Sequence, residues 1–235
     1  ELEAGMALTF ECAAAQRNAP SDYEGRLLRR ILIPLAKLRA TRAGLNAATQ
    51  ALEIFGGNGY MEDWPMARQL RDAQCHTIWE GTENILCLDV RRSIRAEQAH
   101  IALLARIDRA VATARVHDLL AGPCRAVEEA RQESAQAVEW MIGAAEDEAL
   151  LQSRRLAELL ADTVEGALLV EEAAWGLARQ GDARKSLVAA RFCRNHLGSG
   201  PGRGIARPDR SVIDHFEAIT RYGSIDKDAA APYVG

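Results

Sequence analysis

The fold is decided by a stretch near the start of the chain, which reads YEGRLLRRILIPLAKLRATRAGLNAATQALEIFGGNG at residues 23–59. Its apolar side chains recur every three or four residues, the period of one face of an α-helix. They are Leu27, Leu28, Ile31, Leu32, Leu35, Leu38, Leu45, Ala48, Leu52 and Phe55. Gly56 and Gly57 then end the helix, because glycine readily adopts the left-handed conformation that follows a last turn. The pattern predicts a helix over 23–55 that Pro34 kinks or divides.

Helical patterns continue on both sides of this stretch, and no strand-like alternation persists. Asp63 and Pro65 predict a helix start, with the acid as N-cap and proline in the first turn. The helix that starts there is expected to run to about residue 73, and another begins near residue 82. Further helices are expected over 1–17, 98–121, 123–145, 147–179 and 183–196, with a last short one within 211–222. The fold class is therefore all-α, an antiparallel helical bundle over residues 1–97 followed by a helical extension over 98–235.

Composition excludes several classes of function. The chain has 235 residues, 29 Lys and Arg against 33 Asp and Glu, and a net charge of −4, so no global basic field indicates a nucleic-acid partner. No apolar run reaches the ~20 residues that a membrane span needs. Five scattered cysteines, without metal-ligand spacing, indicate no metal site and a reducing, cytoplasmic compartment. The chain begins within a helical pattern, and we expect that its natural beginning is missing.

Two motifs are ambiguous when each is taken alone. Gly56, Gly57 and Gly59 form either a helix stop with a tight turn or a loop whose backbone N–H groups approach a phosphate closely. Glu80 is either an acid that complements a helix N-terminus or a carboxylate beside an apolar wall of Ile78 or Trp79. A carboxylate in such surroundings becomes a usable general base, because loss of water raises its proton affinity.

The order of these motifs changes their interpretation. A long helix ends in LEIFGGNGY at 52–60, a short basic helix with Arg68 and Arg71 follows, and IWEGTENI at 78–85 opens another helix. From about Leu27 to Ile94 this order resembles the C-terminal domain of the acyl-CoA dehydrogenase family. The resemblance implies FAD as cofactor, an acyl-CoA thioester as substrate in fatty acid metabolism, and a homodimer or homotetramer.

The resemblance also implies roles for single residues. Glu80 matches the base that removes the α-proton while the β-hydride passes to FAD, and Trp79 and Gly81 match positions at the substrate. Thr82 and Asn84 match positions that contact FAD at the start of a helix, where free N–H groups and the helix dipole favour phosphate. Gly56, Gly57 and Gly59 match the segment that reaches the FAD of a neighbouring subunit. The family's other domains are absent here, so we expect these 235 residues alone to bind FAD poorly and to be inactive.

This sequence departs from the family pattern in two places. Glu53 stands where the family often has Gln, and a carboxylate near a pyrophosphate would repel it. Trp79 replaces the common Tyr and could narrow the acyl pocket. The long tail, together with NILCLDVR at 84–91, resembles the alkylation-response (AidB-type) branch. That resemblance implies an alternative, a flavoprotein relative with weak dehydrogenase activity whose tail binds DNA or protein.

The tail itself favours plainer interpretations. Basic residues gather over 179–210, but acids balance them and aromatic interleaving is absent, so a solvated helix face is favoured over DNA binding. They are Arg179, Arg184, Lys185, Arg191, Arg194, Arg203, Arg207 and Arg210. Trp140 and Trp175 are expected in the core, and His76 in a loop or interface rather than in catalysis.

Overall fold

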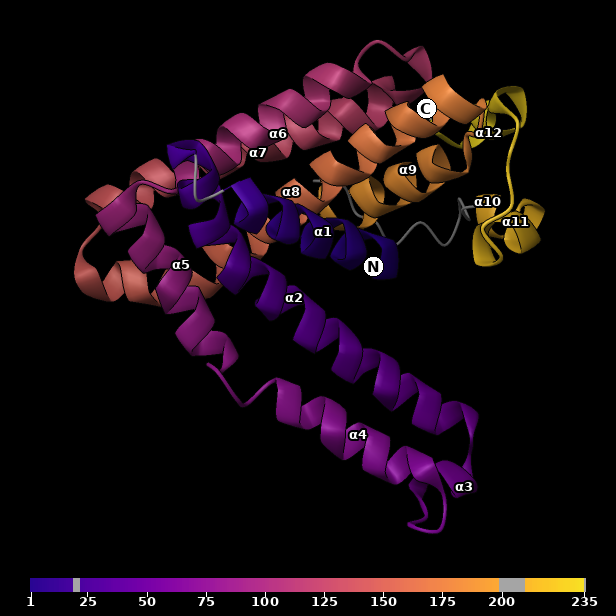
Figure 1. Cartoon of the computed structure of the whole chain (residues 1–235), viewed down its shortest axis with the longest axis horizontal. Helices are drawn as coiled ribbons and strands as arrows, with labels where there is room; N and C mark the ends of the chain where they lie inside the picture. The colour runs from indigo at the N-terminus through magenta and orange to yellow at the C-terminus, as the bar shows by residue number, and fades with distance from the viewer. Residues whose placement is uncertain (19–21, 199–209, 235) are drawn as a thin grey trace. The chain divides into compact units, whose positions relative to one another are not determined.

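The computed structural model describes residues 1–18, 22–198 and 210–234, and within these ranges it contains helices and no strand. The predicted all-α fold is confirmed (Figure 1). The α-helices are α1 (Leu2–Asn18), α2 (Tyr23–Ile54), α3 (Gly57–Tyr60), α4 (Pro65–His76), α5 (Glu83–Glu97), α6 (His100–Ala114), α7 (Ala121–Gly143), α8 (Glu146–Gln180), α9 (Arg184–His196), α10 (Ser211–Asp214), α11 (Phe216–Thr220) and α12 (Lys227–Val234). A short 3-10 helix, η1, covers Asp118–Leu120.

These helices divide into two compact units. Unit 1 comprises Glu1–His100 and Met141–Ala161, and unit 2 comprises Ile101–Trp140 and Asp162–Gly235. Unit 1 therefore holds α1 to α5 with the first half of α8, whereas unit 2 holds most of α6 and α7, the rest of α8 and all later helices. The division of the sequence into 1–97 and 98–235 stays a prediction.

Helix α2 is the axis of unit 1. Helix α1 packs against it, and α4 runs back along its second half with α3 at the turn (Figure 1). Of the two alternatives for Pro34, division is wrong, because the helix is continuous over 32 residues; a kink stays a prediction. Its neighbours Leu32 and Leu35 are fully buried. Their packing offsets the hydrogen bond that proline cannot donate, since most helical stability in proteins comes from tertiary packing.

The start of α4 differs from the prediction by one residue. Pro65 occupies the first turn as expected, but the N-cap is Trp64 and not Asp63. Proline disfavours helical geometry in the residue before it, and Trp64 accordingly adopts an extended conformation with φ −115°. The cap position therefore falls on Trp64, whose side chain makes no capping hydrogen bond.

Unit 2 has its own apolar core, made largely of alanine, leucine and valine from α6 to α9. Two predictions fail here. Trp140 of α7 and Trp175 of α8 are 47% and 58% exposed. Next to Trp175, the small residues Ala173 and Ala174 occupy the buried face of α8 instead. Helix α7 begins at Ala121 and not at the predicted residue 123, so Gly122 and Pro123 lie together in its first turn, a place where proline is well tolerated.

The end of the chain contains more helix than predicted. In place of one helix within 211–222 there are two short ones, α10 and α11, and α12 follows them. Ile225, Ala230 and Val234 pack with Leu187 of α9 in a small apolar cluster. The alanine-rich sequence of α12 carries no periodic stripe of large side chains, so its period gave no signal.

Candidate functional site

The connection between α4 and α5 contains an unusual reversal of the backbone at Glu80. Glu80 has φ +52° and Gly81 has φ +105°. The left-handed region costs a residue with a Cβ atom about 1–2 kcal/mol, whereas glycine enters it freely. Among the described residues only Gln98 and Tyr222 share this feature with Glu80 outside glycine, and Gln98 serves as the C-cap of α5. The candidate base is therefore held in a strained conformation, a feature common at functional sites.

Two sets of hydrogen bonds hold this reversal in place. On the α4 side, the Thr77 hydroxyl donates to the Gln74 carbonyl at 2.9 Å, and the Trp79 N–H donates to the Cys75 carbonyl at 3.2 Å. On the other side, the Lys37 ammonium of α2 donates to the carbonyl oxygens of both Trp79 and Gly81, the latter at 2.9 Å. The two carbonyls that flank Glu80 thus converge on one cation.

The surroundings of Glu80 are open within this chain. Glu80 is exposed, and its apolar neighbours Ile78 and Trp79 are 59% and 55% exposed. The ring of His76, the last residue of α4, lies 5.2 Å from that of Trp79 at a tilted angle. Apolar surface that excludes water from the Glu80 carboxylate would therefore have to come from beyond the described residues.

The start of α5 carries the predicted cofactor residues Thr82 and Asn84. Thr82 is the N-cap, and its side chain makes no capping hydrogen bond. The first turn of a helix has N–H groups without intrahelical partners and a positive end of the helix dipole, a combination that accommodates phosphate. The Asn84 side-chain oxygen accepts a hydrogen bond from Arg154 of α8 at 2.9 Å.

Glu83 would oppose an anion at this helix start, but two arginines neutralise it. Arg154 pairs with its carboxylate at 2.9 Å, and Arg42 of α2 makes a second ion pair. Partial burial works against ionisation, yet the hydrogen bonds from Arg154 and Arg42 outweigh it and lower the pKa of Glu83 below its ordinary value. The arrangement therefore fits a phosphate-bearing cofactor in spite of the adjacent acid.

The glycines before α3 differ in what surrounds them. A Cβ atom added at Gly56 or Gly57 would meet nothing within 4 Å, so their backbone is open to an approaching group. A Cβ atom at Gly59 would lie 2.2 Å from the Leu52 carbonyl oxygen, so packing against α2 by itself requires this glycine. Glu53 is exposed, and its backbone carbonyl accepts the Gly56 N–H at 3.0 Å.

The structure does not bring the glycine loop and Glu80 together. They lie at opposite ends of α4, whose 12 residues separate them by about 18 Å at the usual rise of an α-helix. One copy of the chain therefore presents two separate parts of the candidate site.

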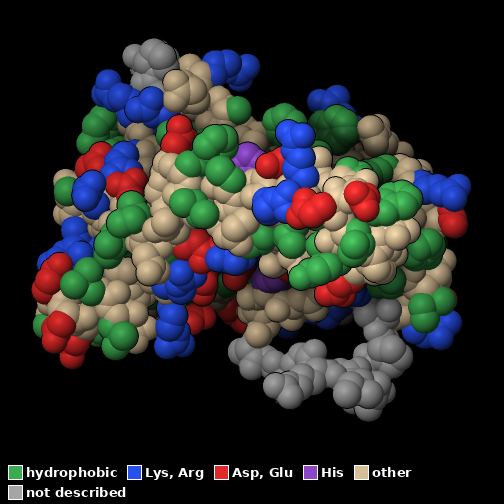
Figure 2. Space-filling view, turned by 90° about the horizontal axis from the view of Figure 1, so that it is seen from below, with side chains coloured by type: hydrophobic (Ala, Val, Ile, Leu, Met, Phe, Trp, Pro, Cys, Tyr) green, Lys and Arg blue, Asp and Glu red, His purple; other side chains and the backbone are tan. Residues whose placement is uncertain are grey.

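The basic residues of the tail are largely engaged within unit 2. Arg184 is buried and lies 4.7 Å from the centre of the Tyr222 ring, Lys185 pairs with Glu172 at 2.7 Å, and Arg194 donates to the Tyr233 carbonyl. Basic and acidic side chains are interspersed on the face shown in Figure 2. Arg203 and Arg207 lie outside the described residues.

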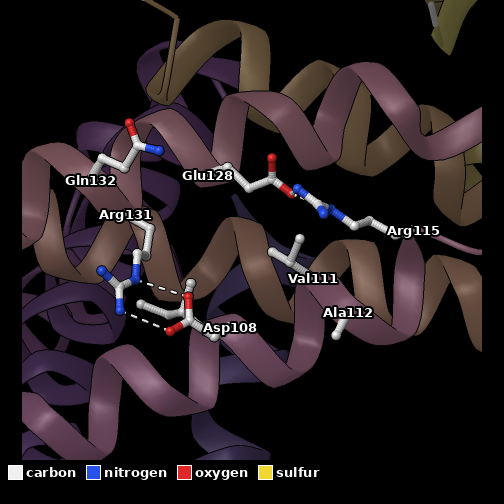
Figure 3. Close-up of a pocket in the computed structure, with 8 residues that line it drawn as sticks. Asp108, Val111, Ala112, Arg115, Glu128, Arg131 and Gln132 are labelled. Atoms are coloured by element: carbon white, nitrogen blue, oxygen red, sulfur yellow. Dashed lines mark hydrogen bonds and ion pairs between the residues drawn. The ribbon is translucent and has the colours of Figure 1, made fainter.

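A cavity of about 370 Å³ lies between α6 and α7 in unit 2 (Figure 3). Its rim carries the pair of Arg131 with Asp108, two hydrogen bonds at 2.8 Å, and the pair of Arg115 with Glu128. Because each guanidinium meets a carboxylate, the cavity offers a ligand no uncompensated charge.

The described residues also bear on metals, membranes and cysteines. They contain no cluster of His, Cys, Asp and Glu suited to a metal ion. None of their helices combines the length and apolarity of a membrane span. Cys87, Cys124 and Cys193 are buried and Cys75 is exposed, all as free thiols. Burial raises the pKa of the Cys193 thiol to about 12, which makes it chemically inert at neutral pH.

Sequence reasoning missed three residues that organise the site, namely Lys37, Arg42 and Arg154. The basic side chains of Lys37 and Arg42 stand between apolar positions of α2, and Arg154 lies 74 residues after Glu80. A basic residue at such a position is ordinarily a solvated one. The only signal for Lys37 and Arg42 was their place on a helix of the predicted bundle. Arg154 lies on a helix predicted within the extension over 98–235, so the sequence carried no signal for it.

Comparison with known proteins places both parts of the chain. Residues 1–95 match the family described as acyl-CoA dehydrogenase, C-terminal domain, and residues 98–202 match the acyl-CoA dehydrogenase 11 C-terminal domain-like family. The chain is 34% identical over 203 residues to acyl-CoA dehydrogenase family member 11 of Caenorhabditis elegans, covering 82% of this chain and 32% of that protein.

Two further matches extend this finding. Putative acyl-CoA dehydrogenase AidB of Escherichia coli is 34% identical over 105 residues, 45% of this chain and 19% of that protein. The crystal structure of C. elegans ACDH-11 in complex with C11-CoA superposes with a TM-score of 0.71 and 28% identity, covering 90% of this chain and 37% of that one. The chain thus spans about a third or less of the length of these relatives.

Proposed function

Because the chain carries the C-terminal helical region of the acyl-CoA dehydrogenase family, we propose that it belongs to an FAD-dependent enzyme that desaturates an acyl-CoA thioester, with Glu80 as base. The observation that carries this proposal is the reversal at Glu80. A glutamate is held at φ +52° between two tethered carbonyls, directly before a helix start suited to phosphate.

Each residue has a task in the proposed reaction. The Glu80 carboxylate takes the proton from the α-carbon of the thioester, while a hydride leaves the β-carbon and a double bond forms between the two carbons. Bound FAD supplies the acceptor for that hydride. An α C–H is a poor acid, so the carboxylate must be aligned and shielded from water. Trp79 and Gly81 flank Glu80 and would border the acyl group.

The proposed cofactor contacts lie at two places, the start of α5 and the glycine loop that follows α2. Thr82 and the free N–H groups of α5 would hold phosphate oxygens of one FAD, with Asn84 oriented by Arg154. Gly56 and Gly57 are open but lie about 18 Å away along α4. They would therefore serve the FAD of a neighbouring subunit, which makes the active protein a homodimer or homotetramer.

The exposed apolar side chains around the glycine loop support this assembly. Ile54, Phe55 and Tyr60 are 84%, 54% and 78% exposed. Large apolar side chains gathered at one place commonly mark an interface. The AidB-type alternative, in which the tail binds DNA or protein, has weaker support. The match to AidB covers 45% of the chain, whereas the match to family member 11 covers 82%.

The test is Glu80→Gln in the full-length protein, with turnover of a panel of straight-chain acyl-CoAs coupled to a dye acceptor. Glutamine keeps the shape and removes the base, so we expect kcat to fall by about 10³-fold or more while the FAD content stays unchanged. Glu62→Gln is the matched control, because Glu62 is an exposed glutamate that pairs only with Arg71 in the same helical hairpin. Equal turnover in the two variants would refute the role of Glu80.

A further inference from the structure

We infer that Lys37 is the positioning residue of Glu80: its ammonium, by binding the two carbonyls that flank the base, keeps the glutamate in its left-handed conformation and aims its carboxylate. This inference rests on the proposed function. It concerns a residue of α2, which lies 43 positions before Glu80 in the sequence and shares no motif with it.

The strain at Glu80 needs a cause in the surrounding structure. A residue other than glycine at φ +52° would relax unless neighbouring contacts oppose the change. The Thr77 and Trp79 hydrogen bonds act before Glu80, towards α4, and do not reach Gly81. Lys37 acts on both sides, at Trp79 and at Gly81. Its two hydrogen bonds therefore span the reversal.

The chemistry of the ammonium suits this task. Lysine presents three donors from one point, so a single group can satisfy two carbonyls that converge on it. Hydrogen bonds from a cation are stronger than neutral ones. With both carbonyl oxygens turned towards α2, the Trp79–Glu80 peptide before the base and the Gly81–Thr82 peptide beyond it are held at the two ends of the reversal.

Lys37 is itself well anchored. It is half-buried on α2, between the buried residues Leu35 and Leu38. That part of α2 is in the core of unit 1, so the backbone at Lys37 cannot shift without disturbing the packing. The position of the Glu80 carboxylate is thereby set by the core of unit 1 and not by the exposed helix α4.

Substitution of Lys37 should therefore impair chemistry more than binding. Misplacement of a catalytic group by about 1 Å costs on the order of 10²-fold in rate. In the full-length protein we expect Lys37→Met to lower kcat by about 10- to 100-fold, with KM changed less than about twofold and FAD content unchanged. Lys37→Arg retains a cation with several donors and should restore most of the lost kcat. Lys227→Met, at an exposed site in α12, is the matched control.

Crystal structures of the full-length protein and its Lys37→Met variant supply a readout independent of activity. We expect Glu80 to leave the left-handed region and its carboxylate to move in the variant, while α4 and α5 keep their positions. An unchanged Glu80, full kcat, loss of FAD, or an Lys37→Arg variant no better than Lys37→Met would each overturn the inference.

The Glu80→Gln variant separates the two proposals. If Glu80→Gln is inactive and Lys37→Met is fully active, only the role of Lys37 is refuted. If Glu80→Gln turns over normally, the proposed base is refuted, whatever Lys37 does.

Discussion

The two halves of α2 contrast sharply in how they are covered. In the first half seven residues are buried, all between Gly25 and Leu38, whereas no residue from Arg39 to Ile54 is buried. The second half packs with α3 and α4 and meets α5 through the Arg42–Glu83 ion pair, and large apolar side chains lie exposed at its end. The first half thus stabilises this chain, whereas the second half presents the surface that a neighbouring subunit covers in the proposed assembly. Lys37 lies where the two meet.

The largest expected effect on stability tests the covered half. Leu35 is fully buried, so Leu35→Ala should lower the free energy of unfolding by about 2–5 kcal/mol through lost burial and the cavity left behind. Leu45 is only half-buried in the second half, and Leu45→Ala should cost about 1 kcal/mol or less. Chemical denaturation of the chain gives both values. Equal costs would remove the contrast between the halves.

The next effect sharpens the contrast at the glycine loop. Gly59→Ala should destabilise the α2–α3–α4 hairpin by about 1–3 kcal/mol, since its methyl group would collide with the Leu52 carbonyl. Gly57→Ala is the control, because open space surrounds that position and alanine is a good helix former. Thermal unfolding should show a lower midpoint for Gly59→Ala only. A similar loss in both variants would mean that the loop glycines share one structural role.

The smallest effect concerns the ion pairs at the start of α5. Glu83→Gln should destabilise the chain by about 1–2 kcal/mol at pH 7, because Arg154 and Arg42 lose their carboxylate partner. The pKa of Glu83 is lowered in the folded state, so this stability is present above the ordinary value of 4.5 and is lost as pH falls through the folded-state pKa.

A pH series of unfolding midpoints checks this sign. The difference between wild type and Glu83→Gln should be largest near neutrality and shrink below about pH 4.5. Glu53→Gln, at the exposed end of α2, is the matched control. A difference that grows on acidification would contradict the pairing.

Much of the fold was readable from periodicity, because long helices with a regular apolar stripe carry a strong local signal. The bounds of α2, α8 and α9 follow from it. The failures had non-local causes. Packing around Leu32 and Leu35 carried the helix through Pro34, and buried alanines left Trp175 exposed. Motif order pointed to Glu80 and Thr82 as site residues, and those assignments stay predictions.

The tether at Lys37 could not be predicted in this way. Nothing in the residues around Lys37 indicates which carbonyls its ammonium meets, since that depends on how α2 packs against the α4–α5 connection. The same holds for Arg154, which reaches Asn84 across 70 positions of sequence. Such contacts follow from tertiary structure alone.

The central claim is that Glu80 removes the α-proton, and a single-turnover measurement tests it most directly. Full-length wild type and Glu80→Gln, both loaded with FAD, are mixed anaerobically with an acyl-CoA, and the bleaching of the flavin is followed in a stopped-flow instrument. The account predicts rapid bleaching in the wild type and bleaching about 10³-fold slower or absent in Glu80→Gln. Bleaching at the wild-type rate in Glu80→Gln would contradict it.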